Sequence, residues 1–234
     1  MTLMRKRAPE QMDQQGLDPG AHIAALNGLR RLNLVCRSAA ILWPSIAEAA
    51  RQQGNQPLRV LDLACGSADN ILEIGCFAHR AGLNVEVFGC DLSSVAIAEA
   101  RRAAKSKRID PKNFFKLDVL AEALPDGFDV VTCSLFLHHL SEHDAQGLLR
   151  KMAAATRQLV LISDLRRTWL GLGLAWAGSR LLTRSSVVHT DAVLSVSAAF
   201  VEAEVANLAA QCGLDGCTIS QHWPQRWLLW WSKQ

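Results

Sequence analysis

Tyrosine is absent from the 234 residues, and aromatic residues of all kinds make up only 6% of the chain. A catalytic phenol is therefore excluded, and any proton transfer falls to His, Asp, Glu, Lys or Cys. A dominant charge is also lacking, because 25 Lys and Arg stand against 22 Asp and Glu for a net charge of +3. This balance is far from the concentrated basic surface of a dedicated nucleic-acid binder, so we expect no nucleic-acid partner.

Long hydrophobic runs are missing as well. The most apolar window, residues 170–182, is shorter than the ~20 residues that span a bilayer and contains Arg180, so no membrane span is expected. The first ten residues are basic but lack the apolar run of a signal peptide, which favours a cytoplasmic protein. The seven cysteines are odd in number and form no CxxC pair, which predicts reduced thiols and no metal site.

Half of the residues are hydrophobic, which at this length is enough for one buried core. From Asp18 to Gln53 apolar residues recur at helical spacing until Gly54 and Pro57 interrupt them. The sequence therefore predicts an N-terminal helical cap over residues 1–56, ahead of a core domain over 57–234.

The core domain alternates between short apolar runs and helical segments. Strands are expected at 58–64, 85–90, 114–117, 128–133 and 158–163, with helices at 69–81, 94–105 and 141–155 between them. A helix at 198–212 and two strands near 217–221 and 226–231 complete the chain. This order is typical of an α/β fold, and we predict a Rossmann-like, seven-stranded, mostly parallel sheet with helices on both faces.

A helical insertion of about residues 166–197 is expected after the fifth strand. Its first part, residues 168–184, is rich in Trp and Leu and too apolar to stand free in water. It is interpreted as a core helix against the sheet edge or as a cap over a hydrophobic ligand. Residues 185–197 are interpreted as a polar turn region.

The first strand runs directly into the small-residue loop VLDLACGSADN, residues 60–70. Small residues at 64, 66 and 68 allow a tight turn and a close approach to a ligand, and the following helix start offers free N–H groups. The second strand ends at Asp91, whose carboxylate can accept two hydrogen bonds from a ribose diol. The third ends at Asp118, a position suited to an adenine amino group.

A dinucleotide oxidoreductase is the alternative interpretation of this loop, and it is disfavoured. Its G-x-G-x-x-G pattern is absent. Asp62 and Asp69 would repel a pyrophosphate, whereas they suit a ligand that carries positive charge.

The loop, together with GCDLSSVAIAEARRAA, FKLDVL and FDVVTCSLFLHHLSEHD, resembles in order and spacing the motifs of small-molecule, class I S-adenosylmethionine-dependent methyltransferases over residues 58–164. The resemblance implies S-adenosylmethionine as donor and S-adenosylhomocysteine as product. It implies that the donor is bound by Asp62, Ala64, Gly66, Ala68, Asn70, Asp91, Leu92, Asp118, Val119 and Ser134, and it makes Arg37 a candidate for the donor carboxylate.

The family pattern has glycine where this chain has Ala64 and Ala68. Their methyl groups are expected to allow a close approach only if both residues keep a negative φ.

Methyl transfer is an in-line displacement, so alignment and exclusion of water come first, and a base is needed only for a protonated acceptor. His138 and His139 follow the fourth strand, at the sheet end where ligands bind in this architecture. His189 lies in the insertion, close to Asp191, which could orient its ring. We take His139 as the first candidate base, ahead of His189 and His138. Two alternatives stay open: packing of the histidine pair against the next helix, and a solvated loop role for His189.

The resemblance and the histidines together favour O-methylation of a hydrophobic small molecule with a phenolic or polyketide-like hydroxyl, as in secondary metabolism. A quinone-pathway C-methyltransferase and a non-catalytic donor-binding scaffold are the alternatives. An RNA or protein methyltransferase would need an acceptor motif such as Asn-Pro-Pro-Tyr, where this chain reads Ser134-Leu-Phe-Leu137. The expected partner is a hydrophobic acceptor, and the expected state is a monomer or homodimer.

Overall fold

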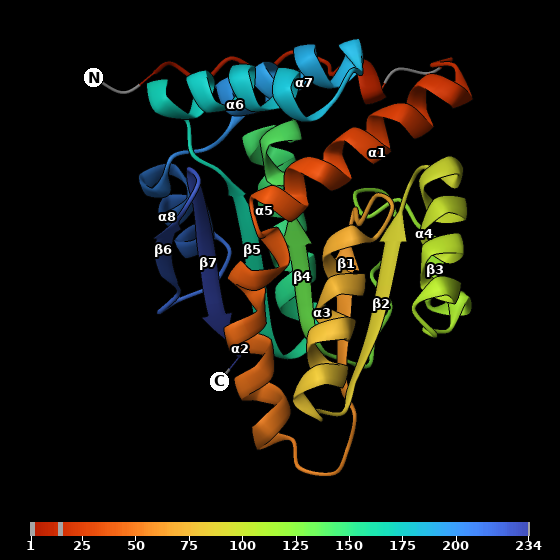
Figure 1. The fold of residues 1–234 in the computed structure, drawn as a ribbon. Coiled ribbons are helices and arrows are strands. Elements are labelled where there is room, and N and C mark those ends of the chain that lie inside the picture. Colours follow the sequence, from red (N-terminus) through yellow and green to blue (C-terminus); the bar gives the residue numbers. More distant parts are fainter. Residues whose placement is uncertain (1–2, 14–15, 234) are drawn as a thin grey trace.

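A seven-stranded sheet with the order β3-β2-β1-β4-β5-β7-β6 forms the centre of the computed structural model, which describes residues 3–13 and 16–233 (Figure 1). The strands are β1 (Leu58–Leu63), β2 (Val85–Asp91), β3 (Phe114–Lys116), β4 (Phe128–Ser134), β5 (Thr156–Leu165), β6 (Thr218–His222) and β7 (Arg226–Ser232). The first five are parallel, and β7 runs antiparallel to both β5 and β6. The predicted seven-stranded, mostly parallel fold is confirmed.

Four of the eight α-helices in the described part of the chain begin where the sequence places a hydroxyl. The helices are α1 (Pro19–Val35), α2 (Ser38–Gln52), α3 (Asp69–Ala81), α4 (Ser94–Ser106), α5 (Glu142–Ala155), α6 (Trp169–Leu182), α7 (Ser186–Ala198) and α8 (Glu202–Gln211), with short 3-10 turns η1 (Gln11–Asp13), η2 (Pro111–Asn113) and η3 (Leu137–His139). Ser93, Ser141, Thr168 and Ser185 each accept a hydrogen bond from the backbone N–H three residues on. Such caps satisfy donors that a helix start leaves open.

The sheet is buried on both faces, as parallel sheets require. Leu61 and Leu63 join the apolar cluster on the α5 and α8 side, whereas Leu58 and Val60 join the cluster on the α2 and α3 side. Successive residues of a strand point to opposite faces, so one short apolar run supplies both clusters. This explains why the strands read as continuous apolar runs in the sequence.

A helical layer of α1, α6 and α7 lies across the end of the sheet toward which the arrows of β2, β4 and β5 point (Figure 1). Residues 3–13 run along this layer as an N-terminal strap. The N–H of Lys6 donates to the carbonyl of Ser197, and the N–H groups of Gln11 and Met12 donate to the carboxylate of Asp191. The strap therefore ties the beginning of the chain to α7.

The expected polar turn region over 185–197 is wrong, because these residues form α7. The hydroxyls that suggested turns bond back into the helix: Ser195 donates to the carbonyl of Asp191, and Thr190 donates to that of Ser186. Serine and threonine can satisfy themselves in this way inside a helix, so their presence does not mark a loop.

Within the residues that the structure describes, no single helix has the length and hydropathy of a membrane span, although α7 and α8, bent by 65° at their junction, pass that test as a pair by length and composition only.

Candidate active site

Asp91 links the loop after β1 to the end of β2. One oxygen of its carboxylate, Oδ2, accepts a hydrogen bond from the N–H of Gly66 at 2.8 Å, and the other, Oδ1, accepts one from the N–H of Ser93 at 2.8 Å. The side chain is half-buried, and a carboxylate oxygen can accept more than one hydrogen bond. Asp91 therefore joins the small-residue loop to the end of β2, and its contact with a ribose diol stays a prediction.

Glycine at position 89 allows this loop to pack on β2. A Cβ at residue 89 would come within 2.8 Å of the Cys65 sulfur and 3.0 Å of the Phe114 ring. On the other side, Leu26 of α1 lies 4.0 Å from the point where a Cβ on Gly66 would be. The loop is thus held between β2 below it and the N-terminal helix above it.

Ala64, Gly66 and Ala68 all adopt left-handed backbone, with φ of 50°, 56° and 63°. The condition set for a close approach at the two alanines, a negative φ, is therefore not met. The loop keeps its left-handed turns with alanine in place of glycine, at a cost of about 1 kcal/mol for each residue.

Asp62 lies buried behind the loop and accepts a hydrogen bond from the Thr132 hydroxyl at 2.7 Å. Burial raises the pKa of Asp62 to about 7, with a further contribution from the charge of Asp91. Burial also raises the pKa of the neighbouring Cys65 thiol, so that this side chain is neutral. The region under the loop therefore has acidic groups whose charge a cationic ligand would stabilise.

The other predicted donor residues occupy different settings. Leu92 follows Asp91 and is 60% exposed, which leaves an apolar side chain available for contact with a flat ring. Asp118 accepts hydrogen bonds from the N–H groups of Leu120 and Ala121 in its own turn, and Val119 is buried beside it. The structure thus brings Asp62, Gly66 and Asp91 together, flanked by Leu92.

The remaining three residues of the predicted donor set lie on separate elements. Asn70 is in the first turn of α3, and Arg37 is an exposed residue between α1 and α2. Ser134 ends β4, and its hydroxyl is buried. Their roles in donor binding stay predictions.

His138 is buried between two carboxylates. Its Nδ1 lies 2.7 Å from Oδ1 of Asp164, and its Nε2 lies 3.6 Å from Oε1 of Glu10. Burial alone would lower its pKa, but the charges and hydrogen bonds of Asp164 and Glu10 outweigh this and raise the pKa of His138 to about 10. His138 is therefore an imidazolium at neutral pH and cannot accept a proton as a general base.

His139 is the more accessible of the pair, with 22% of its side chain exposed. Its ring lies 4.3 Å from that of His138 and 5.8 Å from that of Phe136, and its Nε2 is 3.9 Å from Oε2 of Glu10. Glu10 thus presents one oxygen to each imidazole. Glu10 carries no signal in the sequence, because it lies far from the motifs in a segment without helical or strand periodicity.

His189 lies on α7 rather than in a loop. Its Nε2 is 2.8 Å from the carbonyl oxygen of Thr183. Asp191, the residue expected to orient it, holds the N–H groups of Gln11 and Met12. The structure therefore connects His189 to the α6–α7 junction and Asp191 to the N-terminal strap.

Glu10, His138 and His139 also form a group that could hold a metal ion, since their ligand atoms lie within 4.8 Å of one another. One carboxylate and two imidazoles suit a transition metal such as zinc. Such binding would have to displace the proton that His138 carries, because a metal binds the neutral ring.

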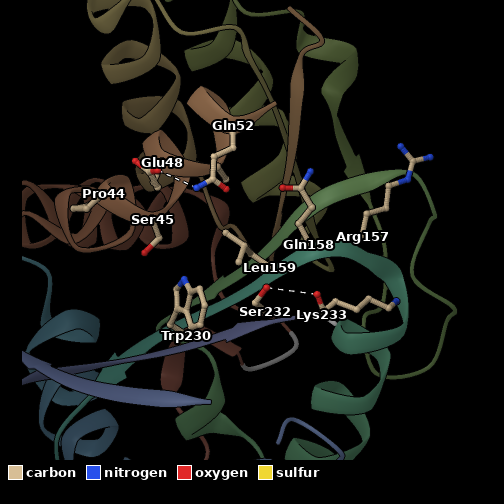
Figure 2. Close-up of a pocket in the computed structure, with 11 residues that line it drawn as sticks. Pro44, Ser45, Glu48, Gln52, Arg157, Gln158, Leu159, Trp230, Ser232 and Lys233 are labelled. Atoms are coloured by element: carbon tan, nitrogen blue, oxygen red, sulfur yellow. Dashed lines mark hydrogen bonds between the residues drawn. The ribbon is translucent and has the colours of Figure 1, made fainter. Parts of the chain in front are cut away.

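A cleft of about 630 Å³ lies at the opposite end of the sheet. It is lined by α2 residues such as Glu48, by Gln158 at the start of β5 and by Trp230 of β7 (Figure 2). Gln52 donates a hydrogen bond to Glu48 at its edge. Ligands of doubly wound sheets bind at the carboxyl ends of the parallel strands, so this cleft is not part of the candidate site.

Residues 60–158 match the family model described as a methyltransferase domain. The chain is also 34% identical over 103 residues to a demethylmenaquinone methyltransferase of Deinococcus radiodurans, an alignment that covers 44% of this chain and 40% of that protein. The chain therefore spans less than half the length of this curated relative.

Two solved structures share the fold. A putative O-methyltransferase of Nostoc punctiforme PCC 73102 superposes with a TM-score of 0.64 at 17% identity, covering 96% of this chain and 64% of the other. Magnesium protoporphyrin IX methyltransferase of Synechocystis PCC 6803, solved with bound S-adenosylhomocysteine, superposes with a TM-score of 0.55 at 17% identity, covering 96% and 92%.

These likenesses agree with the ordered motifs, the strand order and the Gly66–Asp91 contact. Residues 60–158 therefore match a methyltransferase domain, and the chain shares its fold with these two solved structures.

Proposed function

We propose that this chain transfers a methyl group from S-adenosylmethionine to a hydrophobic small-molecule acceptor, by O-methylation of a phenolic or polyketide-like hydroxyl. The observation that carries the proposal is the hydrogen bond from the Gly66 N–H to Asp91, which joins the small-residue loop to the acidic end of β2. The exposed Leu92 beside it and the buried Asp62 below it suit an adenosine bearing a cationic sulfur.

The donor supplies an activated methyl carbon when bound, and the chain's residues supply alignment, exclusion of water and proton removal. Leu26 of α1 lies against the loop at Gly66 and covers part of it. His139 is the proposed base, because His138 is already protonated. Oε2 of Glu10 faces the ring that would become positively charged, so Glu10 would stabilise it.

The hydrophobic acceptor is inferred from the apolar helix α6. Trp169, Leu170, Trp176 and Leu181 of this helix are each more than half exposed. The helix lies in the layer above the carboxyl ends of the strands (Figure 1). An acceptor that enters beside it would meet apolar surface. A cytoplasmic location, a role in secondary metabolism, the division into a cap and a core, and a monomeric or dimeric state belong to the same proposal.

C-methylation is the second candidate, and one observation favours it: the 34% identity to a demethylmenaquinone methyltransferase over 103 residues. A carbon acceptor activated by a neighbouring hydroxyl would use the same base to remove that hydroxyl's proton.

The test is incubation with S-adenosylmethionine labelled in its methyl group and a panel of phenols, with the label located in the products. Label on oxygen supports the proposal, and label found only on ring carbon selects the second candidate. Calorimetry with the donor alone comes first, since a chain that does not bind S-adenosylmethionine at millimolar concentration would overturn both.

A further inference from the structure

Arg226 is a buried cation, and two of its three guanidinium nitrogens have no hydrogen-bond partner among the described residues. The side chain is 4% exposed, and the two nitrogens are Nε and Nη1. Burying an unpaired charge costs several kcal/mol, so structures retain one only where something compensates for it. Arg167, which is equally buried, shows the usual solution: it pairs with Glu204 through two nitrogens and donates to the carbonyl of Leu3.

The other unsatisfied atoms lie beside it. In the part of the chain that the structure describes, the only further buried side-chain atoms without a partner are the hydroxyl oxygens of Ser134 and Ser163. Ser134 is the register partner of Ser163, Ser163 is that of Leu228, and Leu165 is that of Arg226. Residues paired in register, and those two apart on a strand, project from the same face. The three side chains therefore share one face, at the carboxyl ends of β4 and β5 and the amino end of β7.

This face changes character along its length. Its other end is apolar, with Val130, Leu161 and Leu228 in the cluster under α2 and α3. At the carboxyl ends of β4 and β5 the side chains on this face are polar: Thr132, Ser134, Ser163 and, from the neighbouring β7, Arg226. The Thr132 hydroxyl donates a hydrogen bond to Asp62. Among the described residues, the hydroxyls of Ser134 and Ser163 and two nitrogens of Arg226 have no hydrogen-bond partner. A concentration of unsatisfied groups in one place calls for a ligand rather than for separate packing faults.

The position of Arg226 relative to the loop after β1 indicates whether the ligand is the methyl donor or the methyl acceptor. Strands lie about 4.8 Å apart, and the order β1-β4-β5-β7 places Arg226 three spacings, about 14 Å, from the loop after β1. The donor's ribose partner, Asp91, is on β2, on the far side of β1 from β7. Ser134 adjoins the donor region, and the row leads away from it toward Arg226. The guanidinium is thus on the acceptor side.

We propose that Arg226, with Ser163 and Ser134, forms a subsite for an anionic group of the methyl acceptor, so that the substrate is a hydrophobic compound that carries a carboxylate. A guanidinium presents its N–H groups in the fork that matches a carboxylate, and serine hydroxyls can donate to the same group. The identification of the bound compound as the methyl acceptor rests on the proposed function, whereas the anion site itself does not depend on it.

The experiment uses benzoate as the probe and benzamide as its neutral counterpart, each titrated by calorimetry into the chain with and without saturating S-adenosylhomocysteine. Wild type is expected to bind benzoate at least 10-fold more tightly than benzamide, and Arg226→Met to lose that preference. Ser163→Ala is expected to weaken benzoate binding several-fold. Equal binding of both probes by wild type, including no binding of either, or unchanged benzoate binding by Arg226→Met, would overturn the proposal.

Two controls separate the alternatives. S-adenosylhomocysteine should bind Arg226→Met within about 2-fold of wild type. A 10-fold loss would mean that Arg226 holds the donor's own carboxylate and would overturn the acceptor assignment. Arg226→Met should melt no lower than wild type, whereas Arg167→Met should melt well below it. A comparable drop in both variants would make Arg226 structural. If wild type binds benzoate but no donor, the proposed function fails while the anion site stands.

Discussion

Nδ1 of His138 lies 2.7 Å from Oδ1 of Asp164, and the same carboxylate accepts the His138 backbone N–H through Oδ2 at 3.0 Å. One carboxylate thus fixes both the ring and the main chain of the turn that follows β4. Since Glu10 faces the other ring nitrogen, His138 is held as a cation inside the fold. The turn that carries the proposed base His139 is therefore anchored by electrostatics as well as by the apolar packing of Leu137 and Leu140.

This anchoring predicts a loss of stability at alkaline pH. The pKa of His138 is raised from 6.5 to about 10 in the folded protein, so the folded state holds its proton more tightly than the unfolded state. The stabilisation is complete below pH 6.5 and is lost as the pH rises to 10. Urea unfolding at pH 6.5, 8 and 10 should show a falling free energy of unfolding, and His138→Gln should flatten the slope. A slope that is unchanged in the variant would contradict the ion pair.

Asp62 predicts a second pH dependence, between pH 4 and pH 7. Burial raises its pKa from 3.8 to about 7, so the folded state favours the protonated form, and its contribution to stability declines as the pH rises through this range. Asp62→Asn keeps an oxygen for the Thr132 hydroxyl and removes the charge. The variant should therefore gain stability relative to wild type between pH 4 and pH 8. The exposed Asp126→Asn is the control, and a similar gain in both variants would argue against burial as the cause.

The left-handed alanines predict opposite effects of the same substitution at two sites. Ala64→Gly should stabilise the fold by about 1 kcal/mol, because glycine adopts a φ of 50° without the strain of a Cβ. Ala98→Gly, at an exposed position inside α4, should destabilise by about 1 kcal/mol. Thermal unfolding of the two variants measures both, and destabilisation by Ala64→Gly would mean that the loop is not strained.

Removal of the proposed base should separate turnover from donor binding. His139→Ala is expected to lower turnover of a phenolic acceptor by about 100-fold or more, with donor affinity unchanged. Glu10→Gln should lower turnover less and shift the pH profile, because the ring loses the carboxylate that stabilises its protonated form. The same two measurements on His189→Ala test the alternative base. Full turnover in both histidine variants would leave alignment alone as the source of catalysis.

Donor affinity should depend on Asp91 far more than on Asp118. Asp91→Ala removes the acceptor for the Gly66 N–H as well as the proposed ribose contact, so S-adenosylmethionine should bind about 100-fold more weakly. Asp118→Ala, which removes a turn-stabilising carboxylate, should weaken binding by about 10-fold or less. Calorimetry gives both values, and equal losses would contradict the special position of Asp91.

The strands and the small-residue loop could be predicted from the sequence because both depend on residues that are close together in the chain. Apolar runs bounded by Gly, Asp and Ser mark β1, β2 and β4 within two residues of their observed ends. The sequence could not predict features that depend on distant partners. Glu10 and Arg226 look like ordinary charged residues in a linear reading, and only the packing of the strap and the register of β7 bury them.

Local sequence patterns were not sufficient to predict two features, the helix α7 and the backbone conformation of the small-residue loop. The Ser- and Thr-containing segment of α7 resembles a turn because these residues can bond to the backbone in either structure. The sign of φ at Ala64 and Ala68 cannot be read from residue type, since alanine only tolerates the left-handed region when the surrounding fold enforces it.

The N-terminal strap sets the order in which the site can assemble during synthesis. Arg5 donates hydrogen bonds to the carbonyls of His138 and Ala198, partners that are translated 133 and 193 residues later. The strap therefore stays without these partners until α7 has been synthesised. The loop after β1 precedes β4 in the sequence, so the contacts of Glu10 with His138 and His139 become possible only after the residues of the proposed donor loop have been translated.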